Sequence, residues 1–190
     1  RRNSKELAQI VAETFSAINI HVFLFPDLRA TPEVSFAVRH LKCHCGVVLT
    51  ASHNPPEYNG YKVYWQDGGQ IVPPQDAGII TSINNTTYQD IQFEAQQIRI
   101  QHIDEEVDIA FQEASVKVGR IGNGNRNEIK IVFTSLHGTS ITAIPQVLKA
   151  AGYDKVTIIE EQATPDGDFP TVKSPNPEEP EALKMAIEKA

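Results

Sequence analysis

The chain has 190 residues, of which 41% are hydrophobic and 22% are charged, and its net charge is −7. This length suits one domain, or one domain and part of another, and the composition is ordinary for a globular protein with a sizeable core. The acidic charge repels phosphate backbones and anionic membranes, so neither nucleic acid nor a membrane is an expected partner. The N-terminus has no apolar signal-peptide region, and we expect a fragment that is cut at both ends.

In chain order, a helix comes first. Asn3 or Ser4 can cap it, and apolar residues recur after it at helical spacing: Leu7, Ile10, Val11, Phe15 and Ile18. Short apolar runs at 20–25 and 46–51 predict strands. Between them, Thr31 is the predicted N-cap and Pro32 the predicted first residue of a helix that ends near residue 41. Helix-linked apolar strands indicate an α/β fold with a buried sheet.

Cys43 and Cys45 lie just before the second of these strands. One intervening residue is too few for an ordinary structural disulfide, so reduced thiols and a cytoplasmic location are expected. No second Cys/His pair follows at a zinc-ligand spacing, which disfavours a metal site here.

Residues 52–60 are too rich in Pro, Asn and Gly for regular structure. A strand at 61–65, a helix from about 73 to 83 and a helix at 104–117 are predicted next, with Val107, Ala110, Phe111 and Ala114 facing inward. Residues 119–127 are rich in Gly and Asn and indicate a linker, so we place one domain over 1–122 and another over 123–190.

The second unit begins with a strand at 129–133 and a polar loop at 134–140. A helix at 142–151, a strand at 156–160, a proline-rich loop at 164–180 and a helix from about Pro180 follow. This unit is too short to close a domain. The expected fold is therefore a mixed sheet sandwiched by helices, followed by a partial second α/β domain.

Most of the chemical information lies between Gly46 and Lys62, in the run Gly-Val-Val-Leu-Thr-Ala-Ser-His-Asn-Pro-Pro-Glu-Tyr-Asn-Gly-Tyr-Lys. A buried strand delivers Ser52 to its C-terminal end, where open α/β sheets bind ligands. His53 and Asn54 follow, two prolines restrict the backbone after them, and Lys62 lies at the start of the returning strand. A hydroxyl, hydrogen-bond donors and a cation are therefore expected at one edge of the sheet.

Three roles are compatible with this arrangement of Ser52 and its neighbours. Ser52 and Asn54 can simply satisfy backbone groups in a turn. A serine hydrolase would need a buried acid to orient His53, and the Gly-x-Ser-x-Gly motif is absent. In the third role Ser52 carries a phosphoryl group, which His53, Asn54 and Lys62 neutralise and orient.

The run Thr50-Ala51-Ser52-His53-Asn54-Pro55, continued by Tyr58-Asn59-Gly60-Tyr61-Lys62-Val63-Tyr64, resembles the active-site serine signature of the α-D-phosphohexomutases, the phosphoglucomutase/phosphomannomutase superfamily. Further segments resemble the family in the same order: Arg2-Asn3-Ser4, 31–38, 134–139, 166–170 and 175–178. The resemblance spans essentially the whole chain.

This resemblance implies that Ser52 is the phosphoryl carrier of an enzyme that interconverts hexose 1-phosphate and hexose 6-phosphate through a hexose 1,6-bisphosphate. The phosphate on Ser52 would be one ligand of Mg²⁺. Lys62 matches a lysine of proton transfer and charge stabilisation, and His53 and Asn54 match residues that line the site. His137 is a candidate substrate contact or a structural loop histidine. The implied partners are small sugar phosphates, and the implied assembly is a monomer or homodimer.

No Asp-x-Asp-x-Asp-Arg run occurs in the chain, so the carboxylate ligands of the family's metal loop are absent. Asp166 and Asp168 lie in a segment that precedes that loop in the family, and we expect them to be structural. We therefore expect this chain to be inactive by itself. The alternatives are a non-catalytic sugar-phosphate-binding relative, a phosphopentomutase and a hydrolase that uses Ser52.

Overall fold

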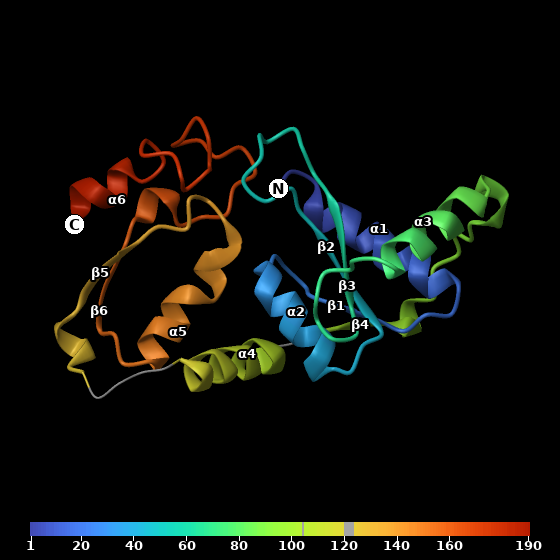
Figure 1. The fold of residues 1–190 in the computed structure, drawn as a ribbon, viewed down its shortest axis with the longest axis horizontal. Helices are drawn as coiled ribbons and strands as arrows, with labels where there is room; N and C mark the ends of the chain where they lie inside the picture. Colours follow the sequence, from blue (N-terminus) through green and yellow to red (C-terminus); the bar gives the residue numbers. More distant parts are fainter. Residues whose placement is uncertain (104, 120–123) are drawn as a thin grey trace.

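The computed structural model describes residues 1–103, 105–119 and 124–190. Figure 1 shows two groups of helices and strands, with α4 running along one edge of the molecule between them. The elements are α1 Ser4–Ala17, β1 Val22–Leu24, α2 Thr31–His40, β2 Cys45–Leu49, β3 Tyr61–Trp65, α3 Gln75–Asn85, β4 Ile100–His102, α4 Glu105–Val118, β5 Lys130–Phe133, α5 Ile144–Ala150, β6 Lys155–Ile158 and α6 Lys184–Lys189. The predicted α/β class is confirmed.

The strands pair two by two. β1 is parallel to β4, β2 is antiparallel to β3, and β5 is parallel to β6. Parallel and antiparallel pairs are thus both present, as the predicted mixed sheet requires. In the described residues, however, no strand pairing joins β1 to β2, so the first unit carries two short sheets in place of one.

Helix α2 carries the core of the first unit. Its Val38 packs with Val48 of β2 and Tyr64 of β3, and all three are at most 9% exposed. Its Ala37 packs with Ile103 and with Val107 of α4. Phe23 of β1 also packs against this second cluster, so a single helix contributes to the cores beside both short sheets. The helix begins at Thr31 itself, one residue before the predicted start.

The apolar residues that recur at helical spacing in α1 are only partly buried. Leu7 is 40% exposed and Ile10 is 56% exposed, whereas the buried positions are Ser4, Ala12, Ser16 and Ala17. Small side chains let the helix lie close to the strands. The size of the side chains, more than their hydrophobicity, therefore decides which face of α1 is buried. Asn3 occupies the predicted N-cap position, but its side chain makes no cap hydrogen bond. Ser4 is the first helical residue, and its Oγ donates to the carbonyl of Leu49 at 3.0 Å.

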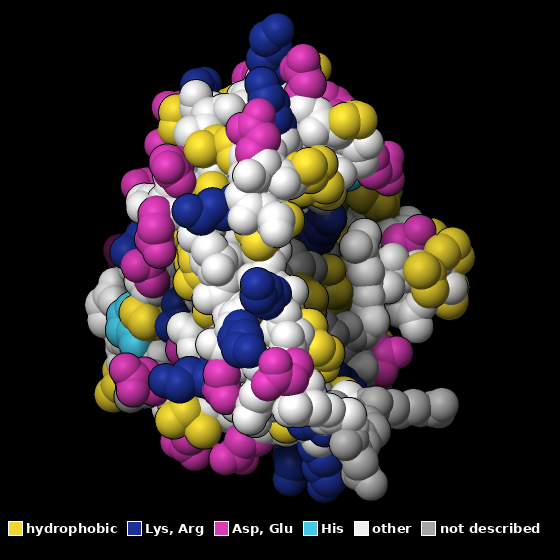
Figure 2. Space-filling view, turned by 90° about the vertical axis from the view of Figure 1, so that its left-hand side faces the viewer, with side chains coloured by type: hydrophobic (Ala, Val, Ile, Leu, Met, Phe, Trp, Pro, Cys, Tyr) yellow, Lys and Arg dark blue, Asp and Glu magenta, His cyan; other side chains and the backbone are white. Residues whose placement is uncertain are grey.

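The second unit contains the parallel pair β5–β6, with α5 and α6 beside it in Figure 1. Helix α4 contacts both α2 and α5, so it belongs to neither unit alone. The predicted boundary at 122/123 lies outside the described residues. Among the described helices, none is both long enough and apolar enough to cross a bilayer. Figure 2 shows acidic and basic side chains interspersed on the face of the second unit.

Candidate active site

The Ser52 loop leaves β2 and returns in β3. The strands are in register with Leu49 opposite Tyr61 and Val48 opposite Lys62. The amide of Thr50 donates to the carbonyl of Gly60 at 2.9 Å and closes the base of the loop. A Cβ on residue 60 would lie 2.7 Å from the Thr50 carbonyl oxygen, so only glycine lets the two ends of the loop approach this closely.

Ser52 lies at the tip of this arrangement and is exposed. Its φ of 56° is left-handed, which is rare for a residue with a Cβ. Its amide donates to Thr50 Oγ1 at 3.1 Å, and its Oγ lies 3.4 Å from Nδ1 of His53. The bend after β2 therefore presents an accessible hydroxyl with one imidazole beside it.

Arg1 holds the backbone of the loop. Its guanidinium donates to the carbonyl oxygens of Asn54 at 2.7 Å, Tyr58 at 2.8 Å and Ser52 at 3.4 Å, and also to that of Pro55. A planar guanidinium with five N–H donors can satisfy several diverging carbonyls at once. Sequence reasoning gave Arg1 no role, because its partners are main-chain oxygens more than fifty residues away, and such partners leave no motif.

A second contact ties the loop to the start of α1. Asn59 Nδ2 donates to Ser4 Oγ at 3.0 Å and to the carbonyl of Arg2 at 3.2 Å. Ser4 in turn donates to Leu49 at the end of β2. The N-terminal segment, α1 and the Ser52 loop are thus one hydrogen-bonded unit, and Figure 1 shows the N-terminus beside this loop.

Lys62 is half-buried on β3, on the same face as Tyr64, which faces α2. Its ammonium makes no hydrogen bond or ion pair with any residue that the structure describes. The register brings Lys62 to the end of the sheet from which the Ser52 loop leaves. No direct bond joins its ammonium to Ser52.

His53 and Asn54 are both exposed. In the described part of the chain, the His53 ring forms a hydrogen bond with Ser52 alone, and no carboxylate binds it. A serine hydrolase therefore lacks its acid here. The backbone N–H of Asn54 donates to the carbonyl of Ala51 at 3.1 Å. The side-chain amide of Asn54 is not used in this bond and is available for a ligand.

His137 lies in the second unit and is 5% exposed. Its Nδ1 lies 3.1 Å from the carbonyl of Thr164 and its Nε2 lies 2.9 Å from Thr171 Oγ1. Both ring nitrogens are therefore engaged within the loops of that unit. Among the described residues, no hydrogen bond joins His137 to the Ser52 loop.

The 164–170 segment touches the N-terminal residues. Asp168 forms an ion pair with Arg2 at 2.5 Å, and the Arg1 guanidinium lies 5.4 Å from the ring centre of Phe169. Asp166 Oδ1 accepts from the amide of Asp168 at 2.8 Å. Both aspartates thus have structural contacts, as expected. Cys43 and Cys45 are free thiols, and no three His, Cys, Asp or Glu side chains of the described residues are grouped to hold a metal.

Comparison with known sequences identifies the family of this chain. Residues 1–90 match the phosphoglucomutase/phosphomannomutase alpha/beta/alpha domain I, and residues 98–190 match domain II. The chain belongs to the phosphoglucomutase/phosphomannomutase family. The family inferred from the Ser52 signature is thereby confirmed. The two matches leave residues 91–97, upstream of α4, between them.

Named relatives agree with this family assignment. The chain is 38% identical over 196 residues to a phosphoglucomutase of Staphylococcus epidermidis, and 36% identical over 196 residues to one of Staphylococcus aureus. Each alignment covers 100% of this chain but 35% of the relative, so the chain spans about a third of the length of these phosphoglucomutases.

Solved structures agree with the fold. A crystal structure of a Thermus thermophilus protein assigned as a phosphomannomutase matches with a TM-score of 0.78 and 26% identity, over 100% of this chain and 41% of that one. A phosphoglucomutase/phosphomannomutase family protein from Burkholderia thailandensis matches with a TM-score of 0.55 and 26% identity, over 76% of this chain and 28% of that one.

Proposed function

We propose that this chain is the phosphoserine-bearing part of an intramolecular phosphotransferase that interconverts hexose 1-phosphate and hexose 6-phosphate, with glucose or mannose as the sugar. The observation that carries the proposal is the exposed Ser52 hydroxyl at the end of β2, on a left-handed residue, in a chain of this family. A residue in a strained backbone conformation, held there by the surrounding structure, is typical of a functional site.

The proposed chemistry uses the serine twice. The phosphoryl group of phosphorylated Ser52 passes to the free hydroxyl of the sugar phosphate, and the bond from phosphorus to Oγ breaks as the bond to the sugar oxygen forms. The proton of that hydroxyl is taken up, and the serine oxygen is reprotonated. The resulting hexose 1,6-bisphosphate then returns its other phosphoryl group to Ser52, which leaves the isomer. Such transfers depend chiefly on alignment and on neutralising phosphate charge.

The surrounding residues have distinct proposed roles. Lys62, whose ammonium is unpaired among the described residues, would stabilise phosphate charge and assist proton transfer. His53 and Asn54 would bind phosphate or sugar oxygens at the same edge of the sheet. His137 would contribute to substrate binding by fixing its loop, because both of its ring nitrogens are already engaged.

A magnesium ion also belongs to this proposal. The described residues hold no cluster of three ligands, so the phosphate on Ser52 would supply one oxygen ligand and the other ligands would come from outside residues 1–190. Bound there, Mg²⁺ would neutralise phosphate charge. The proposed partners are sugar phosphates, not nucleic acid or a membrane, and the proposed location is the cytoplasm.

The test is peptide mapping of the full-length protein after incubation with glucose 1,6-bisphosphate and Mg²⁺. We expect one phosphoryl group, on Ser52. Ser52→Ala should lose it and reduce turnover of glucose 1-phosphate and mannose 1-phosphate at least about a thousandfold. Ser82→Ala, on exposed α3, is the matched control and should change neither. A phosphoryl group on another residue, or full turnover by Ser52→Ala, would refute the proposal.

The same assays separate the alternatives. Ribose 1-phosphate as the better substrate would indicate a phosphopentomutase. Sugar-phosphate binding without any turnover would indicate a non-catalytic relative. Labelling of Ser52 by a fluorophosphonate would indicate a hydrolase. The 190-residue chain alone should give no mutase turnover.

A further inference from the structure

Every N–H group of the Arg1 guanidinium is bonded to the Ser52 loop. Its Nε donates to the carbonyl of Tyr58 at 3.1 Å. Its Nη1 donates to the carbonyls of Ser52 at 3.4 Å and Asn54 at 2.7 Å. Its Nη2 donates to the carbonyl of Pro55 and, at 2.8 Å, to that of Tyr58. A guanidinium has one N–H on Nε and two on each Nη, so these bonds leave no donor free for a phosphate.

The bonds act directly on the residue that carries the hydroxyl. The amide of Ser52 donates to Thr50 Oγ1 and its carbonyl accepts from Arg1, so the peptide groups on both sides of Ser52 are held. A left-handed conformation such as its φ of 56° persists only where the surrounding structure determines it. The rotamers open to a side chain depend on φ and ψ, so Arg1 helps to set the direction in which Ser52 Oγ points.

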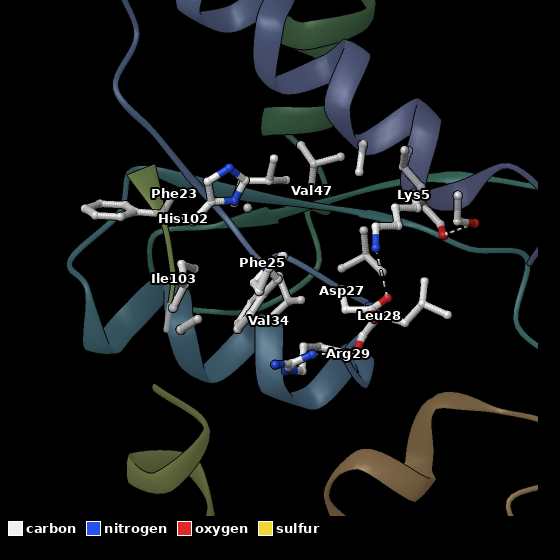
Figure 3. Close-up of a pocket in the computed structure, with 18 of the residues that line it drawn as sticks. Lys5, Phe23, Phe25, Asp27, Leu28, Arg29, Val34, Val47, His102 and Ile103 are labelled. Carbon is white, nitrogen blue, oxygen red and sulfur yellow. Dashed lines mark hydrogen bonds and ion pairs between the residues drawn. The ribbon is translucent and has the colours of Figure 1, made fainter. Parts of the chain in front are cut away.

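The cavity in Figure 3 belongs to the strands and not to this loop. Its volume is about 560 Å³, and residues of β1, β2, α1 and α2 line it. Leu49 is its last lining residue on β2, and none of residues 50–60, all of which the structure describes, lines it. The position of the Ser52 loop therefore depends on the residues that bond to it, among which Arg1 reaches the most carbonyls of the segment 52–58.

The second unit contacts the same guanidinium. Phe169 is 6% exposed, and its ring centre lies 5.4 Å from the Arg1 guanidinium. The φ of Phe169 is 51°, which is again left-handed, and its amide donates to the carbonyl of Asp166 at 3.4 Å. An aromatic face attracts a cation placed over it. Arg1 thus contacts the Ser52 loop and a buried side chain of the second unit at the same time.

We infer that Arg1 is a positioning residue for phosphoryl transfer by Ser52, and that Phe169 of the second unit fixes the guanidinium that holds the loop. The inference rests on the proposed function and adds a route by which the second unit sets the direction of the Ser52 hydroxyl. Phosphoryl transfer requires the attacking and leaving oxygens to be aligned. A small displacement of Ser52 Oγ should therefore slow transfer without weakening the binding of a sugar phosphate.

Single-turnover transfer from phosphorylated Ser52 to glucose 1-phosphate, measured on the full-length protein, tests the role of Arg1. Arg1→Ala should slow transfer about a hundredfold. The affinity for glucose 1-phosphate should change by less than about threefold. Arg1→Lys should be nearly as slow, because one ammonium cannot reach four diverging carbonyls. Guanidinium chloride, well below denaturing concentrations, should speed transfer by Arg1→Ala at least about tenfold and leave Arg1→Lys unchanged.

Arg2→Ala is the matched control. Arg2 has the same charge at the same contact, but its side chain pairs with Asp168 and bonds no described residue of the Ser52 loop. Since this ion pair is exposed, its loss should leave the transfer rate within about twofold.

Three results would overturn the role of Arg1. The first is a normal transfer rate in Arg1→Ala or in Arg1→Lys, because the fan of donors would then be unnecessary. The second is weaker binding of glucose 1-phosphate with an unchanged transfer rate, which would make Arg1 a substrate-binding residue. The third is a slow Arg1→Ala that guanidinium does not speed up.

A double-mutant cycle tests the contact with Phe169. Phe169→Leu removes the aromatic face and keeps an apolar side chain, and it should slow transfer about fivefold. In Arg1→Ala the same substitution should change the rate by less than about twofold, because the guanidinium that the ring contacts is gone. Equal effects of Phe169→Leu in the two backgrounds would overturn the link to the second unit.

These experiments separate the inference from the proposed function. The absence of a phosphoryl group on Ser52 of the unchanged protein would refute the proposed function. Protease cleavage within residues 52–58 would still report whether Arg1 holds the loop, and it should be faster in Arg1→Ala than in Arg2→Ala. Normal transfer and normal cleavage in Arg1→Ala, with Ser52 phosphorylated, would overturn the inference alone.

Discussion

At the residue scale, the left-handed backbone of Ser52 makes a prediction about stability as well as chemistry. A residue with a Cβ at φ 56° costs about 1 kcal/mol relative to glycine. Ser52→Gly should therefore raise the free energy of unfolding above that of Ser52→Ala by about 1 kcal/mol in urea titrations, although both variants lack the hydroxyl. The same pair at Ser82, inside α3, should show the reverse order, because alanine favours a helix. Equal stability of the two Ser52 variants would contradict the strain.

Sequence analysis predicted site residues from the chemistry of their side chains, and it missed the residues whose hydrogen bonds hold the Ser52 loop in place. Ser52, His53 and Lys62 lie in one short run, so their placement at one end of the β2–β3 pair follows from a strand, a bend and a returning strand. Arg1 and Asn59 hold the loop through bonds to main-chain oxygens or to Ser4. Many side chains could donate such bonds, so no residue type at either position signals the contact.

At the element scale, the first turn of α2 contains a buried carboxyl beside an ion pair. Glu33 is 2% exposed, and its Oε2 has no hydrogen-bond partner among the described residues. Next to it, Arg29 binds Asp108 of α4 through two bonds of 2.9 and 2.8 Å. Burial, with the nearby Asp108 carboxylate, raises the pKa of Glu33 from 4.5 to about 7, against the opposing effect of Arg29.

This raised pKa predicts the pH dependence of stability. The folded chain binds a proton at Glu33 more tightly than the unfolded chain, so this residue should lower the free energy of unfolding as pH rises from 4.5 to about 7. Glu33→Gln stays neutral and should remove that slope, with a gain over the wild type of at most about 3 kcal/mol at pH 8 and almost none at pH 4. Exposed Glu181→Gln is the control and should leave the slope in place. Parallel stability curves for Glu33→Gln and the wild type would contradict this view of α2.

The elements also differ in how well a single sequence predicts them. Strand β3 has the predicted bounds, because alternation and the Asp67-Gly68-Gly69 turn delimit it. Strand β4 was missed, since Ile100-Gln101-His102 is short and mostly polar and exists through its pairing with β1. The apolar spacing in α1 did not predict its buried face for a related reason. That face is set by how closely the helix approaches the strands, and the spacing of apolar residues along the sequence carries no information about the distance between helix and strands.

At the scale of the whole molecule, the Ser52 loop and the second unit meet through the N-terminal residues. Gly167 packs against them so closely that a Cβ there would lie 2.7 Å from the backbone nitrogen of Arg2. The neighbouring ion pair between Arg2 and Asp168 has side chains 56% and 61% exposed, so it contributes at most about 1 kcal/mol. Backbone fit at Gly167, more than charge, should therefore hold this contact.

Gly167→Ala tests that view. The added methyl group must displace main chain, so the free energy of unfolding should fall by about 1–3 kcal/mol. Protease cleavage within residues 52–58 should become faster, because Arg1 bonds that loop and packs on Phe169 beside the displaced segment. Gly78→Ala is the matched control: nothing lies within 4 Å of its added Cβ, and helix α3 should gain about 0.5–1 kcal/mol. If Gly167→Ala left both stability and cleavage unchanged, the Ser52 loop would be held by the first unit alone.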